Sequence, residues 1–198
     1  MKKITLNALA AILFVGSAAF MTSCSDSDDN EPAQTASIYE RLGGTTMVND
    51  PDNPGQMIEQ GRLSYRKVVN STIGLIVADI QAGATGNLSA HFAPLLAEAP
   101  ATQATNVAEL SDNLTDFFSY NTGGTNAVNM YTGLSMADAH NPAVNSRMGV
   151  KATNADYSKF EGYVGAAAVA NGVAANTQLY TDVVAVLESL RPTIVQAN

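Results

Sequence analysis

Three helix-start signals constrain this chain more than any other feature of its sequence. The segments 37–40, 135–138 and 153–156 each place a serine or threonine three residues before an acidic residue. In such a capping box the hydroxyl accepts a hydrogen bond from the backbone N–H three residues on, and the acid reaches back to the first residue. The pattern therefore predicts α-helices that begin at these three places.

Apolar spacing predicts further helices between these signals. The segment 56–79 contains no proline and is mostly apolar. The part 73–77 would also suit a buried strand, but strands rarely exceed about eight residues, which favours a helix. The segment 106–120 repeats apolar residues at intervals of three and four, which is typical of an amphipathic helix. A last helix is expected to end at Arg191-Pro192. We therefore expect an all-α fold.

The N-terminal 23 residues resemble a lipoprotein signal peptide. A basic start precedes the apolar run 6–20, which is shorter than the roughly 20 residues of a membrane span. Such a run is typical of the h-region of an exported protein. Met21-Thr22-Ser23-Cys24 resembles a lipobox, and Cys24 is the one cysteine of the sequence, so it cannot form an internal disulfide. We expect lipidation at Cys24; the alternative is a plain signal peptide followed by a chance cysteine.

The residues after Cys24 divide into a tether and a domain. Residues 24–36 are acidic and polar, a composition that cannot bury enough apolar surface to fold. Residues 37–198 have the length of one domain. The net charge of −8 and the pI near 4.5 argue against a nucleic-acid partner, which needs basic surface. We expect a lipid-anchored protein of the cell envelope, on the outer membrane or the cell surface.

Five segments in order resemble the group I truncated haemoglobins. They are 37–45 (SIYERLGGT), 116–125 (DFFSYNTGGT), 131–140 (YTGLSMADAH), 153–173 and 187–195, and together they span most of the predicted domain. The resemblance implies a two-over-two helical sandwich around haem b, with an extended connection between the first two helices (the family's A and B helices).

The resemblance also implies a set of haem-contacting residues. His140 corresponds to the ligand of the haem iron, and Met136 lies one turn before it on the same helix face. A capped surface histidine is the simpler alternative for His140. The family's pattern places these further side chains around the cofactor: Ile73, Phe92, Leu110, Asn113, Leu114, Phe117 and Phe160.

Two assignments of residues around the haem leave alternatives open. The second helix can be aligned so that either Ile73 or Tyr65 takes the distal position that the family often gives to a tyrosine; we prefer Ile73. His91 is the other histidine of the sequence and a weaker candidate for a second axial ligand, because a loop histidine is more often exposed to solvent. Asn113 is the one candidate hydrogen-bond donor to a bound gas.

The function that the resemblance implies is the binding of a diatomic gas, O2, NO or CO, for oxygen binding or NO detoxification. Catalysis stays open: NO oxidation would need an external electron-donor protein, because the sequence carries no flavin or nicotinamide motif. Two alternatives are a globin-like surface binding module without haem and a lipoprotein that captures haem. A nucleophile motif of the hydrolase type is missing from the sequence.

Overall fold

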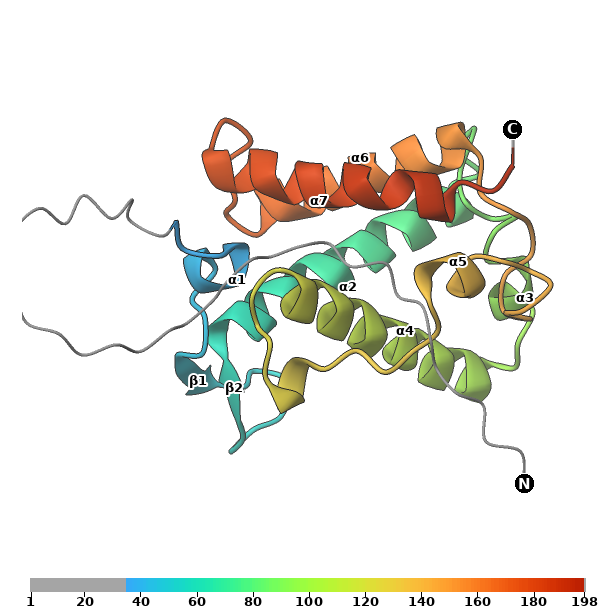
Figure 1. Cartoon of the computed structure of the whole chain (residues 1–198). Coiled ribbons are helices and arrows are strands. Elements are labelled where there is room, and N and C mark those ends of the chain that lie inside the picture. Colours follow the sequence, from blue (N-terminus) through green and yellow to red (C-terminus); the bar gives the residue numbers. More distant parts are fainter. Residues whose placement is uncertain (1–34, 198) are drawn as a thin grey trace, which may run out of the picture. The chain divides into compact units, whose positions relative to one another are not determined.

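A computed structural model describes residues 35–197, which form one compact unit (Figure 1). The predicted signal peptide, Cys24 and the tether up to residue 34 lie outside the described residues. Within the described part, no helix is both long enough and apolar enough to cross a membrane.

Four long helices build the domain. They are α2 (Gln60–Gln81), α4 (Pro100–Asn121), α6 (Asn154–Ala170) and α7 (Gln178–Ile194). Helix α2 packs against both α4 and α6, and α6 packs in turn against α7. The expectation of a mostly helical fold is therefore confirmed.

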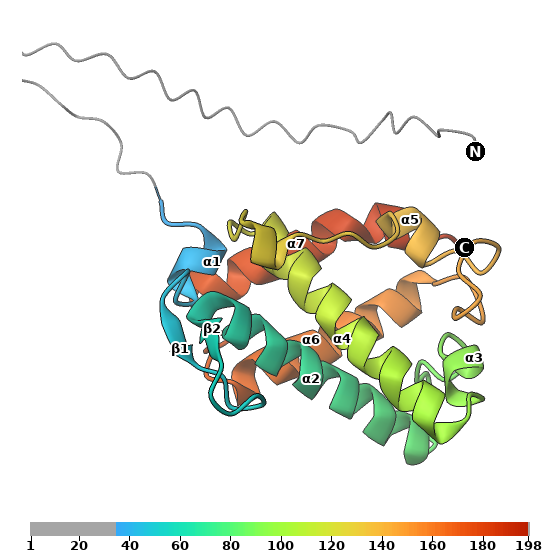
Figure 2. The same cartoon turned by 90° about the horizontal axis from the view of Figure 1, so that it is seen from below.

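Short helices close the two ends of this framework. They are α1 (Ile38–Arg41), α3 (Ala93–Leu96), the 3-10 helix η1 (Ala127–Asn129) and α5 (Met136–Ala139). Figures 1 and 2 both show α1 at one end of the domain and α3 and α5 at the other. The reciprocal capping boxes at 37–40 and 153–156 form as predicted. At 135–138 half of the predicted capping box forms, because the Ser135 hydroxyl accepts from the Asp138 N–H at 3.2 Å. The Asp138 carboxylate accepts from the Ser135 hydroxyl at 2.9 Å rather than from the Ser135 N–H.

A β-hairpin occupies the extended connection before α2, where no strand was expected. Strand β1 (Met47–Asn49) pairs antiparallel with β2 (Met57–Glu59). The helix predicted from residue 56 therefore begins only at Gln60. The reason is a tertiary contact: Asp50, at the hairpin turn, accepts a hydrogen bond from the Arg66 guanidinium of α2 at 3.0 Å. This ion pair fixes the turn against α2, so residues 57–59 pair with β1 instead of extending the helix.

Two other helix ends differ from the expectation. Helix α4 begins at Pro100, six residues earlier than predicted, because proline at the first position of a helix has a suitable φ and needs no N–H partner. Helix α7 continues through Pro192 to Ile194. Proline inside a helix loses one backbone hydrogen bond. The last turn is held by packing, because Ile194 is 6% exposed and contacts Ala152 and Tyr157.

The end of the chain ties α5 to the start of α6. The backbone N–H groups of Gln196 and Ala197 both donate to the Ala152 carbonyl at 3.0 Å. The Gln196 side-chain amide donates to the Ala137 carbonyl of α5 at 2.7 Å. These bonds hold the one-turn helix α5 in place, although α5 has no buried residue of its own.

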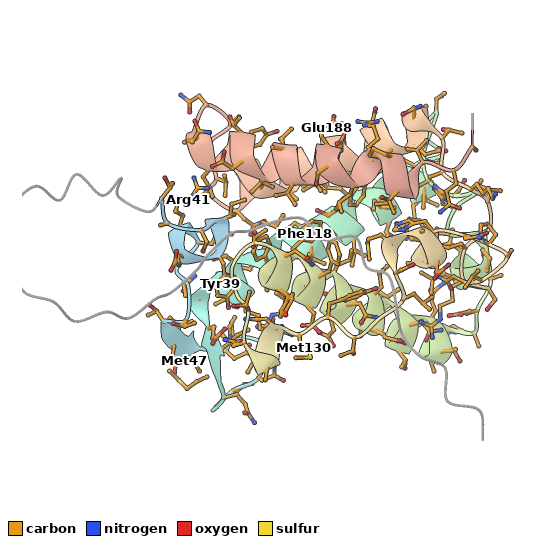
Figure 3. The ribbon with its side chains drawn as sticks, viewed as in Figure 1. Tyr39, Arg41, Met47, Phe118, Met130 and Glu188 are labelled. Carbon is orange, nitrogen blue, oxygen red and sulfur yellow. The ribbon has the colours of Figure 1, made fainter. Side chains whose placement is uncertain are left out.

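A network of side-chain hydrogen bonds stabilises the end of the domain that contains α1. The Tyr39 hydroxyl donates to Glu59 Oε2 at 2.5 Å, and Asn129 Nδ2 donates to the same oxygen at 2.9 Å. Burial, followed by the hydrogen bond to Glu59, raises the pKa of Tyr39 to about 12. Gly124 lies against this network, and a Cβ there would come within 2.9 Å of Asn129 Nδ2. Figure 3 shows Tyr39, a residue of α1, and Met47 of β1 at the outer edge, where Met47 is 52% exposed.

Candidate functional site

A large cavity lies between the long helices and the α3–α5 end. Its volume is about 590 Å³, and α2, α4, α6, α7 and the segments 88–96 and 131–148 all contribute to its wall. This volume falls within the range of small-molecule and cofactor sites. The cavity is lined by every side chain that the sequence placed around a cofactor: Ile73, Phe92, Leu110, Asn113, Leu114, Phe117, Met136, His140 and Phe160.

His140 reaches the cavity from the end of α5. Helix α5 ends at Ala139 because Pro142 disfavours helix at the residue before it. His140 Nδ1 lies 2.8 Å from the Met136 carbonyl, which can only accept, so Nδ1 carries the proton. The Nε2 atom keeps its lone pair and makes no hydrogen bond to a described residue. This orientation is the one that metal-binding histidines adopt.

The protonation state of His140 also suits a metal ligand. Burial lowers the pKa of His140, and the nearby His91 lowers it further, against the opposing effect of the Met136 hydrogen bond. A lowered pKa keeps the imidazole neutral at pH 7, and only the neutral form can donate its Nε2 lone pair. The alternative of a capped surface histidine does not describe this position, because His140 is partly buried and lines the cavity.

The wall contributed by α4 is mostly apolar. Leu110, Leu114 and Phe117 follow at helical spacing and face the same space as Ile73 of α2. Asn113 is the polar residue among them, and its side-chain amide makes no hydrogen bond to the described residues. An amide in this position can donate to a small polar ligand inside a mostly apolar cavity.

Tyr65 points away from the cavity, whereas Ile73 lines it. The Tyr65 ring is 6% exposed and stacks between Tyr39 and Phe118, with centroid distances of 6.5 and 6.0 Å. Its hydroxyl donates to Thr122 Oγ1 at 2.7 Å, so this group is already committed to the α1 end of the domain.

His91 is buried, contrary to the exposure expected of a loop histidine. It is 7% exposed and lines the cavity. Its Nδ1 lies 2.9 Å from the Val150 carbonyl, and its own carbonyl accepts from the Gly149 N–H at 2.8 Å. These bonds between segments 59 residues apart explain the burial. They show His91 fastening the 141–150 segment to the loop after α2.

Tyr131 and Arg147 are among the cavity residues that the sequence analysis did not indicate. Tyr131 lines the cavity, packs edge-on against Phe117 at 5.4 Å, and donates its hydroxyl to the Leu134 carbonyl at 2.7 Å. Arg147 also lines the cavity and pairs with Glu109 of α4. Tyr131 lies within the family-like segment 131–140 and was accessible to that argument. Arg147 follows from tertiary contacts alone.

The donor set of the described part determines which metal chemistry is compatible with it. Within residues 35–197 no three histidine, cysteine or acidic side chains gather to hold a bare metal ion. The neutral imidazole of His140 beside a mostly apolar cavity suits a metal that arrives with ligands of its own, as iron does in a porphyrin. No protein-family model matches this chain, and no curated protein is detectably similar to it.

Proposed function

We propose that this domain binds haem b through His140 and uses the bound iron to hold a diatomic gas, O2, NO or CO. The observation that carries the proposal is the His140 side chain, whose Nδ1 is fixed on the Met136 carbonyl and whose Nε2 is left without a protein partner at an apolar cavity of about 590 Å³. When bound, haem would supply an iron with one coordination position open to the gas.

The helical framework supports a truncated-globin fold as part of this proposal. Helix α2 contacts α4, α6 contacts α7, and all four helices contribute residues to the cavity wall. We propose that these pairs form the two layers of the family's two-over-two sandwich. The hairpin of β1 and β2 then accounts for the extra length between the first two helices of the family pattern.

The remaining groups around the cavity favour gas binding over covalent chemistry on the protein. Asn113 supplies a free amide beside apolar neighbours, which suits one hydrogen bond to a bound gas. Such a bond contributes about 1 kcal/mol. NO oxidation would require electrons from an external donor protein, which makes that activity conditional on a partner.

The proposal extends to the place where the domain works. We propose that a lipid on Cys24 anchors the protein in the cell envelope and leaves the domain outside the membrane. Incorporation of labelled palmitate into the full chain, and its loss in Cys24→Ser, would support this anchoring. Equal labelling of both chains would contradict it.

The test of haem binding is the absorption spectrum of the full-length chain carrying Cys24→Ser, after addition of haem. We expect a sharp Soret band that shifts with CO. It should be lost or displaced in His140→Gly, restored by added imidazole, and kept in His91→Ala. His91→Ala is the matched control, because the sequence holds these two histidines and both line the cavity.

Unchanged free-haem absorbance in the parent chain would overturn haem binding and favour a globin-like surface module. Far-UV circular dichroism of each variant distinguishes a lost ligand from a lost fold. Rapid transfer of the bound haem to a second haem protein would instead favour haem capture as the function.

A further inference from the structure

Arg147 is the single lysine or arginine among the described residues that line the cavity. It lies in the segment 141–150, between α5 and α6. Its side chain is 44% exposed, so it marks a place where the cavity opens to solvent. The cavity wall is mostly apolar, and the exposure of Arg147 indicates that its positive charge lies at the mouth.

The Arg147 side chain forms an ion pair with Glu109 at the mouth of the cavity. Its Nη1 atom lies 2.9 Å from Oε2 of Glu109, and the Glu109 side chain is 52% exposed. Glu109 belongs to α4 and also lines the cavity. An ion pair with this exposure contributes little stability, about 0–1 kcal/mol, and is therefore easily exchanged for another anion.

The backbone around Arg147 is held much more firmly than its side chain. The Asn145 amide donates to the Ala139 carbonyl at 2.8 Å, and the Arg147 N–H donates to Asn145 Oδ1 at 3.1 Å. Further along, Gly149 and Val150 bond to His91. The segment thus presents the Arg147 guanidinium at a fixed place next to the helix that carries His140, and only the side chain needs to move.

We propose that Arg147 binds a carboxylate of the molecule in the cavity, exchanging Glu109 for it. The guanidinium is planar and pairs with carboxylates through two parallel hydrogen bonds. The ligand is therefore a largely apolar molecule that carries a carboxylate at its edge. This inference rests on the proposed function: for haem, the carboxylate is a propionate, with the apolar ring inside the cavity and the acid at the mouth.

The test compares haemin with haemin dimethyl ester, in which both propionates lack their charge. Affinities are measured for the full-length Cys24→Ser chain and for Arg147→Gln, Glu109→Gln and Lys151→Gln in that background. Lys151 is the matched control, because it is an exposed cation four residues away that does not line the cavity.

We expect Arg147→Gln to weaken haemin binding by about three- to fivefold, the size that an ion pair of this exposure gives, and to leave ester binding unchanged. Glu109→Gln should strengthen haemin binding, because it removes the competing carboxylate. Lys151→Gln should change neither affinity.

An equal effect of Arg147→Gln on haemin and on the ester, or no effect on either, would overturn the role of Arg147 while leaving haem binding intact. Binding of neither compound to the parent chain would overturn the proposed function and this inference together. Far-UV circular dichroism identifies any variant that has lost its fold, and Arg147→Lys then replaces Arg147→Gln: a retained single charge should recover part of the haemin affinity.

Discussion

Replacing Tyr65 by phenylalanine should lower the stability of the fold without changing gas binding at the candidate site. The change removes one hydroxyl that donates to Thr122 Oγ1 at 2.7 Å and leaves the stacked ring in place. Thr122 still donates its hydroxyl proton to the Phe118 carbonyl. The variant therefore leaves the acceptor Thr122 Oγ1 without the Tyr65 donor, and it leaves no donor without an acceptor. The net cost of such a neutral bond is about 1 kcal/mol. In a domain of this size, that lowers the melting temperature by roughly 2–4 °C.

Gas binding should not respond to this change. Tyr65 does not line the cavity, whereas Asn113 does. In the haem-loaded protein we expect the O2 dissociation rate to be unchanged by Tyr65→Phe. Loss of the Asn113 donor in Asn113→Leu should raise the O2 dissociation rate about fivefold, the equivalent of one hydrogen bond of about 1 kcal/mol. Thermal melts measure the melting temperature, and stopped-flow experiments measure the O2 dissociation rate. Tyr120→Phe is the control, because Tyr120 is 37% exposed and lies outside the cavity.

One result would refute this reasoning. If Tyr65→Phe speeds O2 release several-fold without lowering the melting temperature, Tyr65 occupies the distal position of the second helix when haem is bound. The alignment that gives this position to Ile73 would then be wrong, and α2 would have to rotate from the orientation seen here.

Two further predictions concern the segment around the histidines. Because the pKa of His140 in the fold lies below its usual 6.5, the unfolded chain binds more protons in the interval beneath that value. The unfolding free energy of the haem-free protein should therefore fall as the pH drops below about 6.5. Urea titrations should show a smaller fall in His140→Gln, and equal slopes would contradict the assignment. At Gly149 an added Cβ would come within 2.2 Å of the Ala90 carbonyl oxygen. Gly149→Ala should thus detach the 141–150 segment and increase hydrogen exchange there, whereas Gly162→Ala, with open space around it, should not.

The helices were predictable because their signals are local. Capping side chains bond within three residues, and apolar spacing repeats within one turn, so the sequence locates α6 and α7 without reference to the rest of the chain. The hairpin was not predictable in this way. It depends on Asp50 reaching Arg66, sixteen residues away, and on residues 57–59 pairing with 47–49.

The candidate site likewise contains residues that sequence segments predict and residues whose place depends on tertiary contacts. His140 and its cavity neighbours could be named from a family-like order of segments, each of which is recognisable alone. The burial of His91 depends on the Val150 carbonyl, and the place of Arg147 depends on Glu109 of α4. Neither partner is near in sequence, so residue type and spacing gave no indication of either contact.

The C-terminal residues after α7 belong to the site as much as to the fold. They hold α5 through Gln196 and the start of α6 through Ala152. Proteolytic clipping after Ile194 would leave the four long helices intact but remove these bonds to the short helix that precedes His140. If the domain binds haem as proposed, a preparation trimmed by a few residues should then give a mixture of haem spectra with unchanged helix content. Mass spectrometry of the intact chain should accompany every spectrum of this protein.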